Sequence, residues 1–207
     1  MPRLVDHEVR RREITDAVRR VIIDGGLEAV TFQSVAAEAG MSVRLVQYYF
    51  GTKKDFLLAT HRSVIEDAGA RFLQRWNALG ADATPRAAIR AVLIELLPLN
   101  EQRRGDIVVL GAFDWAAITG RGSTAQETFA PQALATVIAG QFERAGRADG
   151  FAPRLDAELV SLAIGGLAHG MLQGYLPAES AVELVDHLLD RMLGANTDDS
   201  TDPLRAS

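Results

Sequence analysis

The sequence predicts an all-α protein of about nine helices, with an N-terminal three-helix domain followed by a larger helical domain. Beyond residue 58, apolar residues recur at helical spacing, and breakers interrupt them at regular intervals. No segment shows a convincing two-residue alternation of apolar and polar residues, and no internal repeat is visible. We expect three parts: residues 1–55, residues 56–195, and a polar, acidic tail at 196–207 that is expected to be disordered.

The first expected element is an amphipathic helix that ends near Gly26. Its apolar side carries five residues at helical spacing: Val9, Ile14, Val18, Val21 and Ile22.

Two short helices are expected next, and this segment is the most informative part of the chain. Thr31 is a suitable N-cap for the first of them, because its hydroxyl can accept a backbone N–H. Gly40 can supply the left-handed position that ends that helix, and Ser42 can cap the second. The second helix is expected to carry three residues inward: Leu45, Val46 and Tyr49.

A helix, a glycine turn and a capped helix at this spacing are typical of a DNA-binding helix-turn-helix, whose second helix enters the major groove. A generic helical hairpin gives a similar pattern, so the flanking sequence has to support the assignment. It does, because a helix precedes the pair and Thr52–Asp55 has the form of a capping box that opens another. The helices would pack as a homeodomain-like bundle around Val18, Ile22, Val35, Leu45, Tyr49 and Leu57.

The remaining helices follow from the same signals. The helix that opens at Thr52 is expected to reach about residue 79, and Thr84-Pro85 restarts a helix in the cap-then-proline manner. Pro131 is expected to kink the helix that contains it. The later helices are expected at residues 87–97, 102–119, 123 or 124 to 147, 156–173 and 180–193.

The N-terminal pattern resembles the TetR family of one-component bacterial transcription regulators. The resemblance covers roughly residues 9–58, and Tyr49–Lys53 matches the family's Tyr-Phe-x-Ser/Thr-Lys turn. The other residues that carry it are Ala17, Gly26, Thr31, Val35, Ala36, Ala39, Gly40, Ser42 and Leu57. Many members have Lys-Gly at Val43-Arg44, a tyrosine at Gln47 and a histidine at Tyr48, so base reading has to be argued from the residues present.

The resemblance implies a ligand-responsive repressor that binds double-stranded operator DNA as a homodimer. Arg44 lies near the start of the second short helix, where a guanidinium can reach a guanine edge, and Gln47 can meet an adenine or a phosphate. Tyr48 and Lys53 are expected to hold the DNA backbone. The full set of expected DNA-binding residues is Thr31, Gln33, Ser42, Val43, Arg44, Gln47, Tyr48, Tyr49 and Lys53.

The charge is unusual for a DNA-binding protein, because the net charge is -5. Residues 1–55 hold nine basic and eight acidic side chains, so the negative charge belongs to the rest of the chain. Weak basicity predicts modest non-specific affinity and a strong dependence on dimerisation.

The last two expected helices carry more apolar surface than one core needs, which favours a homodimer with a four-helix interface. The alternative is that all of this surface is intramolecular core. The expected interface residues are Leu159, Leu162, Gly166, Gly170, Leu184, Val185, Leu188 and Met192.

Aromatic residues on separate helices suggest an apolar pocket for a small-molecule effector. The alternative for the aromatic residues is ordinary core packing. The alternative for His169, which could be a polar contact in the pocket, is a hydrogen-bonded residue of the core or of an interface. The expected pocket residues are Phe72, Trp76, Leu93, Leu97, Phe113, Trp115, Phe129 and His169.

Other classes find little support. The chain has no cysteine, no signal peptide is recognisable, and no uninterrupted apolar run approaches ~20 residues, so a cytoplasmic protein without a membrane partner is expected. Motifs of common enzymes are absent, and the four histidines are scattered, so no cofactor or metal is expected. Two alternatives remain. One is a ligand-independent helix-turn-helix dimer whose C-terminal half only assembles the dimer or recruits a protein partner. The other is an all-helical enzyme with a fortuitous N-terminal motif.

Overall fold

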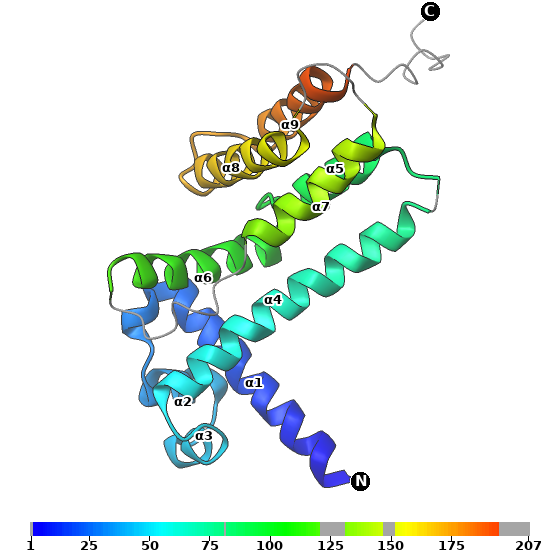
Figure 1. Ribbon diagram of the computed structural model, residues 1–207. Coiled ribbons are helices and arrows are strands. Elements are labelled where there is room, and N and C mark those ends of the chain that lie inside the picture. Colours follow the sequence, from blue (N-terminus) through cyan, green and yellow to red (C-terminus); the bar gives the residue numbers. More distant parts are fainter. Residues whose placement is uncertain (1, 81, 121–130, 147–151, 195–207) are drawn as a thin grey trace, which may run out of the picture. The chain divides into compact units, whose positions relative to one another are not determined.

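The computed structural model describes residues 2–80, 82–120, 131–146 and 152–194, with side chains from residue 7 and, in the third range, from residue 134. These residues form helices and no strand, which confirms the all-α fold class (Figure 1). The elements are α1 (Pro2–Gly25), a 3-10 turn η1 (Leu27–Ala29), α2 (Phe32–Ala39), α3 (Val43–Tyr49), α4 (Lys53–Ala78), α5 (Pro85–Glu95), α6 (Glu101–Ile118), α7 (Pro131–Arg144), α8 (Pro153–Leu172) and α9 (Ala178–Leu193).

The local signals of the sequence act as expected at the start of the chain. The Thr31 hydroxyl accepts the Ser34 N–H at 3.0 Å and caps α2. Gly40 ends α2 with a φ of 64°, in the left-handed region that favours glycine. The Ser42 hydroxyl accepts the Leu45 N–H at 3.2 Å and caps α3. The expected helix-turn-helix is therefore confirmed in its backbone.

The chain divides into two compact units, each with its own core. The first unit contains residues 1–71 and 100–129, and the second contains residues 72–99 and 130–207. Buried apolar residues of α1, α2, α3, α4 and α6, with two from the connecting segments, form the first core: Ile14, Ala17, Val18, Ile22, Val30, Val35, Ala36, Val46, Phe50, Phe56, Val64, Val109 and Phe113.

Helix α6 packs with the N-terminal helices, a placement that the sequence did not suggest. Gly105 makes this packing close, because a Cβ there would lie 3.0 Å from the Ile23 Cδ1 atom. Val109 and Phe113 follow on the same side of α6 and are buried in the first core. The functional boundary expected near residue 55 stays a prediction, whereas the packing unit includes α6.

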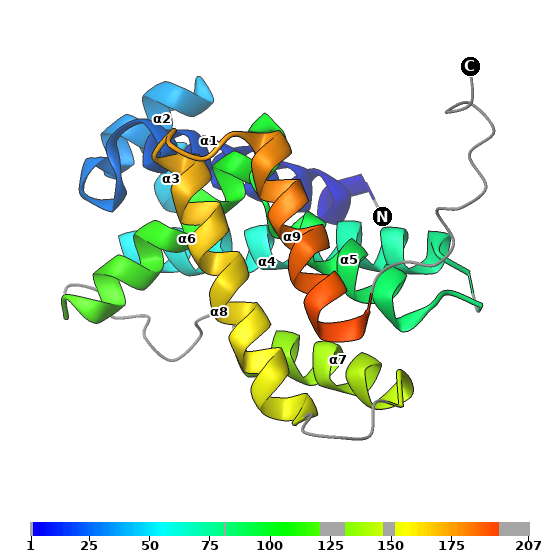
Figure 2. The ribbon, with the colours of Figure 1, turned by 90° about the horizontal axis from the view of Figure 1, so that it is seen from above.

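The second unit is built from the end of α4 and from α5, α7, α8 and α9, and Figure 2 shows these helices from above. Ion pairs join α5 to α9, and the shortest are Arg86 to Asp190 at 2.5 Å and Arg90 to Asp186 at 2.6 Å. The helix ends lie within a few residues of those expected, except that α7 is described only from Pro131, where the sequence suggested a kink. The expected disordered tail at residues 196–207 lies outside the described residues.

Candidate nucleic-acid interface

Helix α3 presents one buried and one exposed face. Val46 is fully buried in the first core, and Phe50, which follows the helix, is 1% exposed. Arg44, Gln47 and Tyr48 are exposed, and Tyr48 reaches 75%. A recognition helix needs this division, because one face must anchor it while the other reads the groove.

Leu45 corrects one detail of the expected core. The sequence suggested that it points inward, but it is 36% exposed. Successive residues of an α-helix differ by about 100° in direction, so burial of Val46 turns the preceding side chain aside. Leu45 therefore lies with Tyr48, three residues later, on the side of α3 that solvent reaches.

The other expected DNA-binding residues surround this face with different accessibility. Thr31, Gln33, Ser42 and Lys53 are exposed, whereas Val43 is partly buried. The Lys53 ammonium is 3.4 Å from the Leu27 carbonyl oxygen, a long contact that leaves its remaining donors for a phosphate. Tyr49 is also partly buried, and the centroid of its ring lies 4.8 Å from that of His7 and 5.2 Å from that of Tyr48.

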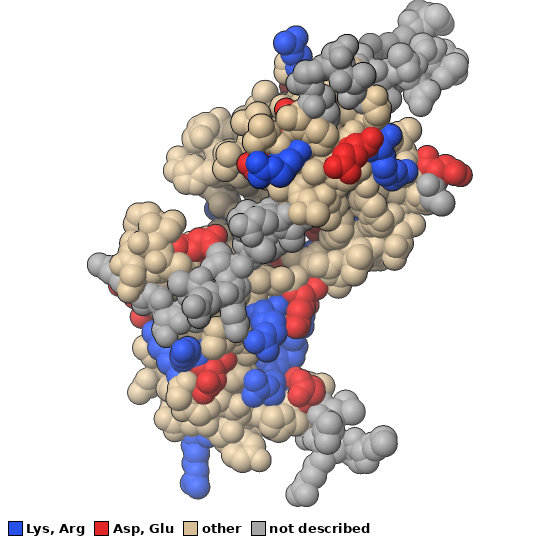
Figure 3. Space-filling view, viewed as in Figure 1, with Lys and Arg blue, Asp and Glu red and all other residues tan. Residues whose placement is uncertain are grey.

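Most arginines of α1 contact other parts of the protein. Arg10 pairs with Glu13 on the same helix at 2.7 Å, and Arg20 pairs with Glu38 of α2. Arg12 and Arg19 both reach Asp67 of α4, at 2.7 and 2.6 Å. The α1 arginines whose side chains the structure describes therefore do not form one DNA-facing surface. On the face shown in Figure 3, basic and acidic side chains alternate over the first unit.

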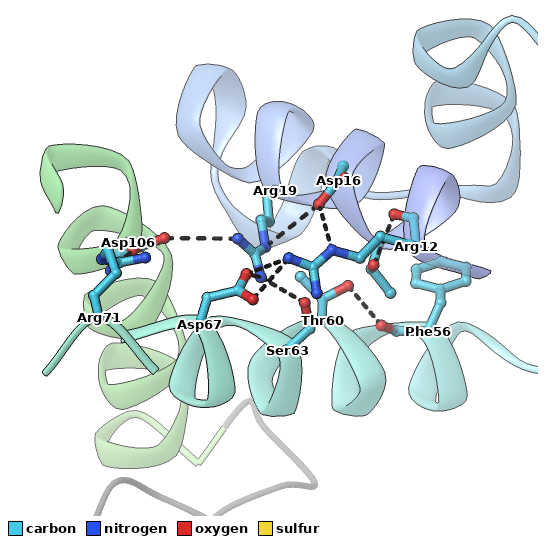
Figure 4. A network of polar contacts seen from close by, with 10 residues as sticks. Arg12, Asp16, Arg19, Phe56, Thr60, Ser63, Asp67, Arg71 and Asp106 are labelled. Atoms are coloured by element: carbon cyan, nitrogen blue, oxygen red, sulfur yellow. Dashed lines mark hydrogen bonds and ion pairs between the residues drawn. The ribbon is translucent and has the colours of Figure 1, made fainter. Parts of the chain in front are cut away.

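A polar network joins α1, α4 and α6 inside the first unit (Figure 4). Arg19 donates to Ser63 at 2.5 Å and to Asp67 at 2.6 Å, and lies 3.8 Å from Asp106 of α6. Arg71 donates to Asp106 at 2.5 Å. The network ties α1, the helix that precedes the helix-turn-helix, to α4 and α6.

The two carboxyl groups of this network are shifted in opposite directions. Burial works to raise the pKa of Asp67, but hydrogen bonds and charges from Arg12 and Arg19 outweigh it, so the pKa lies below its usual value. Burial dominates at Asp106 and raises its pKa, while Arg71 and Arg19 offset only part of that rise. The environment therefore favours the ionised form of Asp67 and disfavours that of Asp106.

The residues expected to line an effector pocket do not form one cluster. In the second unit, Leu93 and Leu97 are fully buried, and the partly buried rings of Phe72 and Trp76 lie 5.7 Å apart. The other expected pocket residues are placed as follows. Phe113 belongs to the first core and meets His61 edge-on, Trp115 is 66% exposed, His169 is exposed beside Gln173, and Phe129 lies outside the described residues.

The residues expected at a dimer interface also divide. Leu159, Leu162 and Leu184 are 61%, 74% and 44% exposed. A Cβ on Gly166 would meet nothing within 4 Å, so another helix has room to approach there. Within the described part of the chain, these four residues leave an uncovered apolar face on α8 and α9.

The remaining expected interface residues contact other residues of the chain itself, and their place in a dimer stays a prediction. The space beside Gly170 is taken by the chain's own Tyr175, whose ring would lie 3.0 Å from an added Cβ. Val185 is fully buried in the second core, and Leu188 and Met192 are partly buried against it. The period of α9 turns these side chains toward the second core, and no sequence signal separates a core stripe from an interface stripe.

Helix α8 is the one helix in the described part of the chain that is long and apolar enough to cross a membrane by length and composition. One face of α8 packs against other helices of the second unit, because its residues Ala157, Val160 and Ile164 are buried in the second core. The described ranges contain no group of three or more histidine, cysteine, aspartate or glutamate residues that could hold a metal ion.

Comparison with known proteins places this geometry in context. Residues 14–60 match the family described as bacterial regulatory proteins, tetR family. The HTH-type transcriptional regulator PksA of Bacillus subtilis is 32% identical over 113 residues, which are 55% of this chain and 54% of that protein. The match thus spans about half the length of this curated relative.

Solved structures extend the likeness to both units. A transcriptional regulator from Rhodococcus sp. Rha1 is 25% identical, with a TM-score of 0.68 over 89% of this chain and 94% of that one. AibR, solved in complex with isovaleryl coenzyme A and operator DNA, is 19% identical, with a TM-score of 0.66 over 90% of this chain and 100% of that one. The latter likeness shows a shared fold.

Proposed function

We propose that the chain, whose residues 14–60 match the tetR family of bacterial regulatory proteins, is a member of that family and a ligand-responsive repressor that binds a palindromic operator as a homodimer. The observation that carries this proposal is the exposed face of α3, where Arg44, Gln47 and Tyr48 are accessible on a helix anchored by Val46. Arg44 reads a guanine edge, Gln47 reads an adenine or contacts a phosphate, and Tyr48 contacts the backbone.

Phosphate contacts come from the residues around α3. Lys53 lies at the start of α4, where a cation and the helix N-terminus together suit an anion. Thr31, Gln33, Ser42, Val43 and Tyr49 flank the same surface. With few basic side chains free of internal partners, one protomer alone binds weakly, and affinity depends on engaging two half-sites.

Dimerisation through α8 and α9 supplies the second half-site. Leu159, Leu162, Gly166 and Leu184 form the uncovered apolar face, and Gly166 lets the partner helix come close. An isologous interface of this kind pairs the same patch with its copy, which matches the two-fold symmetry of a palindromic operator.

A small effector releases the protein from DNA. The supporting observation is the partly buried pair Phe72 and Trp76, near the end of α4, a helix that also carries Lys53 at its start. An effector bound beside these rings can act on α4 as a lever and move the recognition helices away from the ~34–36 Å half-site spacing. Since AibR was solved with isovaleryl coenzyme A, acyl-coenzyme A compounds are the first class to test.

The rival is a dimer that binds DNA without an effector, its second unit serving only assembly or recruitment of a protein partner. Both readings describe a cytoplasmic regulator and not an enzyme, as the relatives are transcriptional regulators. Selection from a random DNA duplex library tests the shared part: recovery of a two-fold symmetric site supports it, and no enrichment overturns it.

An acyl-coenzyme A panel then separates the two readings. Titrations followed by calorimetry, with and without the selected operator, should show that each ligand weakens the other by the same factor. Effector affinity that operator DNA leaves unchanged would contradict the lever, and no binding by any compound would favour the ligand-independent dimer.

A further inference from the structure

Two residues of α1 hold the C-terminal end of α3. The Arg11 Nη1 atom donates a hydrogen bond to the Tyr49 carbonyl oxygen at 2.8 Å. The guanidinium carbon of Arg11 lies 4.1 Å from the centroid of the Phe50 ring, which is 1% exposed. One helical turn earlier, the His7 ring lies 4.8 Å from the Tyr49 ring at an interplanar angle of 54°.

The end of α3 needs such support. The helix spans only Val43–Tyr49, and helices this short are not stable without tertiary contacts. The last carbonyl groups of a helix lack intrahelical partners and carry partial negative charge. A guanidinium suits this position, since its planar group can donate to a carbonyl and stack on an aromatic ring together.

The contact is connected to the surface proposed to meet DNA. The Tyr49 ring meets the Tyr48 ring edge-on, with centroids 5.2 Å apart and an interplanar angle of 86°. Tyr48 is 75% exposed, and Arg44 lies one turn before it on α3. The direction in which both side chains leave the protein therefore depends on how the end of α3 is held.

We infer that Arg11 is a positioning residue for base reading: it clamps the Tyr49 carbonyl and the Phe50 ring, and so fixes the orientation of α3. The inference rests on the proposed DNA-binding function. Base contacts depend on hydrogen-bond geometry, whereas non-specific binding depends on charge near the phosphates. Loss of the clamp therefore weakens operator binding more than non-specific binding.

A direct phosphate contact by Arg11 is the competing role. Arg11 lines a shallow hollow together with Gly51 and Arg62, so its side chain is within reach of solvent. A phosphate contact predicts a different signature: equal loss of specific and non-specific affinity, and a salt slope lower by about 0.9 for each lost contact.

Three variants separate these roles. Arg11→Met removes the clamp and the charge, Arg11→Lys keeps the charge but not the planar group, and Arg10→Met removes the same charge from the adjacent residue, which pairs with Glu13 of its own helix. Fluorescence anisotropy would compare the selected operator with a scrambled duplex over a series of salt concentrations. Hydrogen exchange of the peptide that contains α3 would report on the clamp itself.

We expect Arg11→Met to lower the ratio of specific to non-specific affinity at least about tenfold, which corresponds to about 1.4 kcal/mol. Arg11→Lys should fall between wild type and Arg11→Met, and Arg10→Met should leave the ratio unchanged. Exchange of the α3 amides should accelerate in Arg11→Met and not in Arg10→Met. If Arg11→Met does not fold, Arg11→Lys carries the test, and a lowered ratio supports the clamp.

An unchanged ratio in a folded Arg11→Met protein, or in Arg11→Lys where that variant carries the test, would overturn the inference. Equal loss on both duplexes with a lower salt slope would also overturn it and assign a phosphate contact. If wild type shows no preference for any duplex, the proposed function fails. The exchange comparison still decides whether Arg11 holds α3, because it needs no DNA.

Discussion

Replacing Asp67 with asparagine would test whether the network in Figure 4 stabilises the first unit. Asp67 accepts hydrogen bonds from Arg12 and Arg19 of α1, at 2.7 and 2.6 Å. Asparagine has nearly the same shape, so the change removes the charge and one acceptor without creating a cavity. The effect on the free energy of unfolding therefore measures the polar contacts and not the packing.

The two contacts contribute unequally. The side chains of Arg19 and Asp67 are 14% and 20% exposed, so their charged hydrogen bond is worth about 1.5–3 kcal/mol. Arg12 is 51% exposed, and a pair of this kind contributes about 0.2–1 kcal/mol. Because asparagine keeps one acceptor oxygen, we expect Asp67→Asn to lower the free energy of unfolding by about 2–3 kcal/mol at neutral pH.

The pH dependence gives a second test with a definite sign. The pKa of Asp67 is lowered in the folded protein, so its contribution is present above its unfolded pKa of about 4 and is lost as pH falls through the folded pKa. The difference between wild type and Asp67→Asn should therefore shrink in acid. The pKa of Asp106 is raised, so ionisation of this group lowers the stability of the wild type as pH rises from the unfolded pKa through the folded one. Relative to Asp106→Asn, the wild type should therefore gain stability in acid, opposite to the comparison with Asp67→Asn.

Urea unfolding followed by circular dichroism, at fixed protein concentration, would measure these differences. Glu158→Gln is a matched control, because Glu158 and its partner Arg154 are 47% and 79% exposed, and the expected change is below about 0.5 kcal/mol. The reasoning would be refuted if Asp67→Asn behaved like the control at neutral pH. A destabilisation of equal size at neutral and acidic pH would refute the electrostatic explanation.

Other substitutions test the proposed interfaces. Arg44→Ala should cost about 1–3 kcal/mol on the selected operator and relax preference at one base pair per half-site, measured by repeating the selection; equal loss on all duplexes would contradict base reading. Lys53→Ala should weaken specific and non-specific binding alike and lower the salt slope, so an unchanged slope would argue against a phosphate contact. Gly166→Leu should yield monomers in light scattering and lose operator affinity, since no described residue fills that space, and a dimer that still binds operator would move the interface elsewhere. Gly170→Leu should lower the melting temperature instead, because Tyr175 occupies its space.

The backbone of the helix-turn-helix could be predicted from the sequence because its determinants are local. Thr31 and Ser42 each accept an N–H three residues later, and Gly40 needs only its own φ. Capping and turn preferences act over a few residues, so a single sequence displays them directly. Leu45 was wrongly expected to point inward because α3 has only seven residues, too few for the spacing of its apolar residues to define one buried face.

The roles of the α1 arginines could not be predicted, because their partners are distant in the sequence. Arg12 and Asp67 are 55 positions apart, and Arg11 and Tyr49 are 38 apart. A run of arginines beside a DNA-binding motif gives no signal that separates structural cations from DNA-binding ones. The same limit applied to Phe113, whose neighbour His61 lies on another helix of the first core.

The internal use of these arginines has a consequence for DNA binding. Asp67 and Glu38 hold Arg12, Arg19 and Arg20 against α4 and α2, and these carboxylates offset much of the positive charge, whereas Arg11 binds the end of α3 through a neutral carbonyl and keeps its charge. Non-specific affinity scales with the number of phosphates that free cations can neutralise. A helix-turn-helix held in place by internally paired arginines therefore binds random DNA weakly. Selectivity then rests on the geometry of α3 and on two half-sites bound together. The clamp at Tyr49, which orients α3, and the uncovered face of α8 and α9, which brings two protomers together, would therefore both contribute to selectivity.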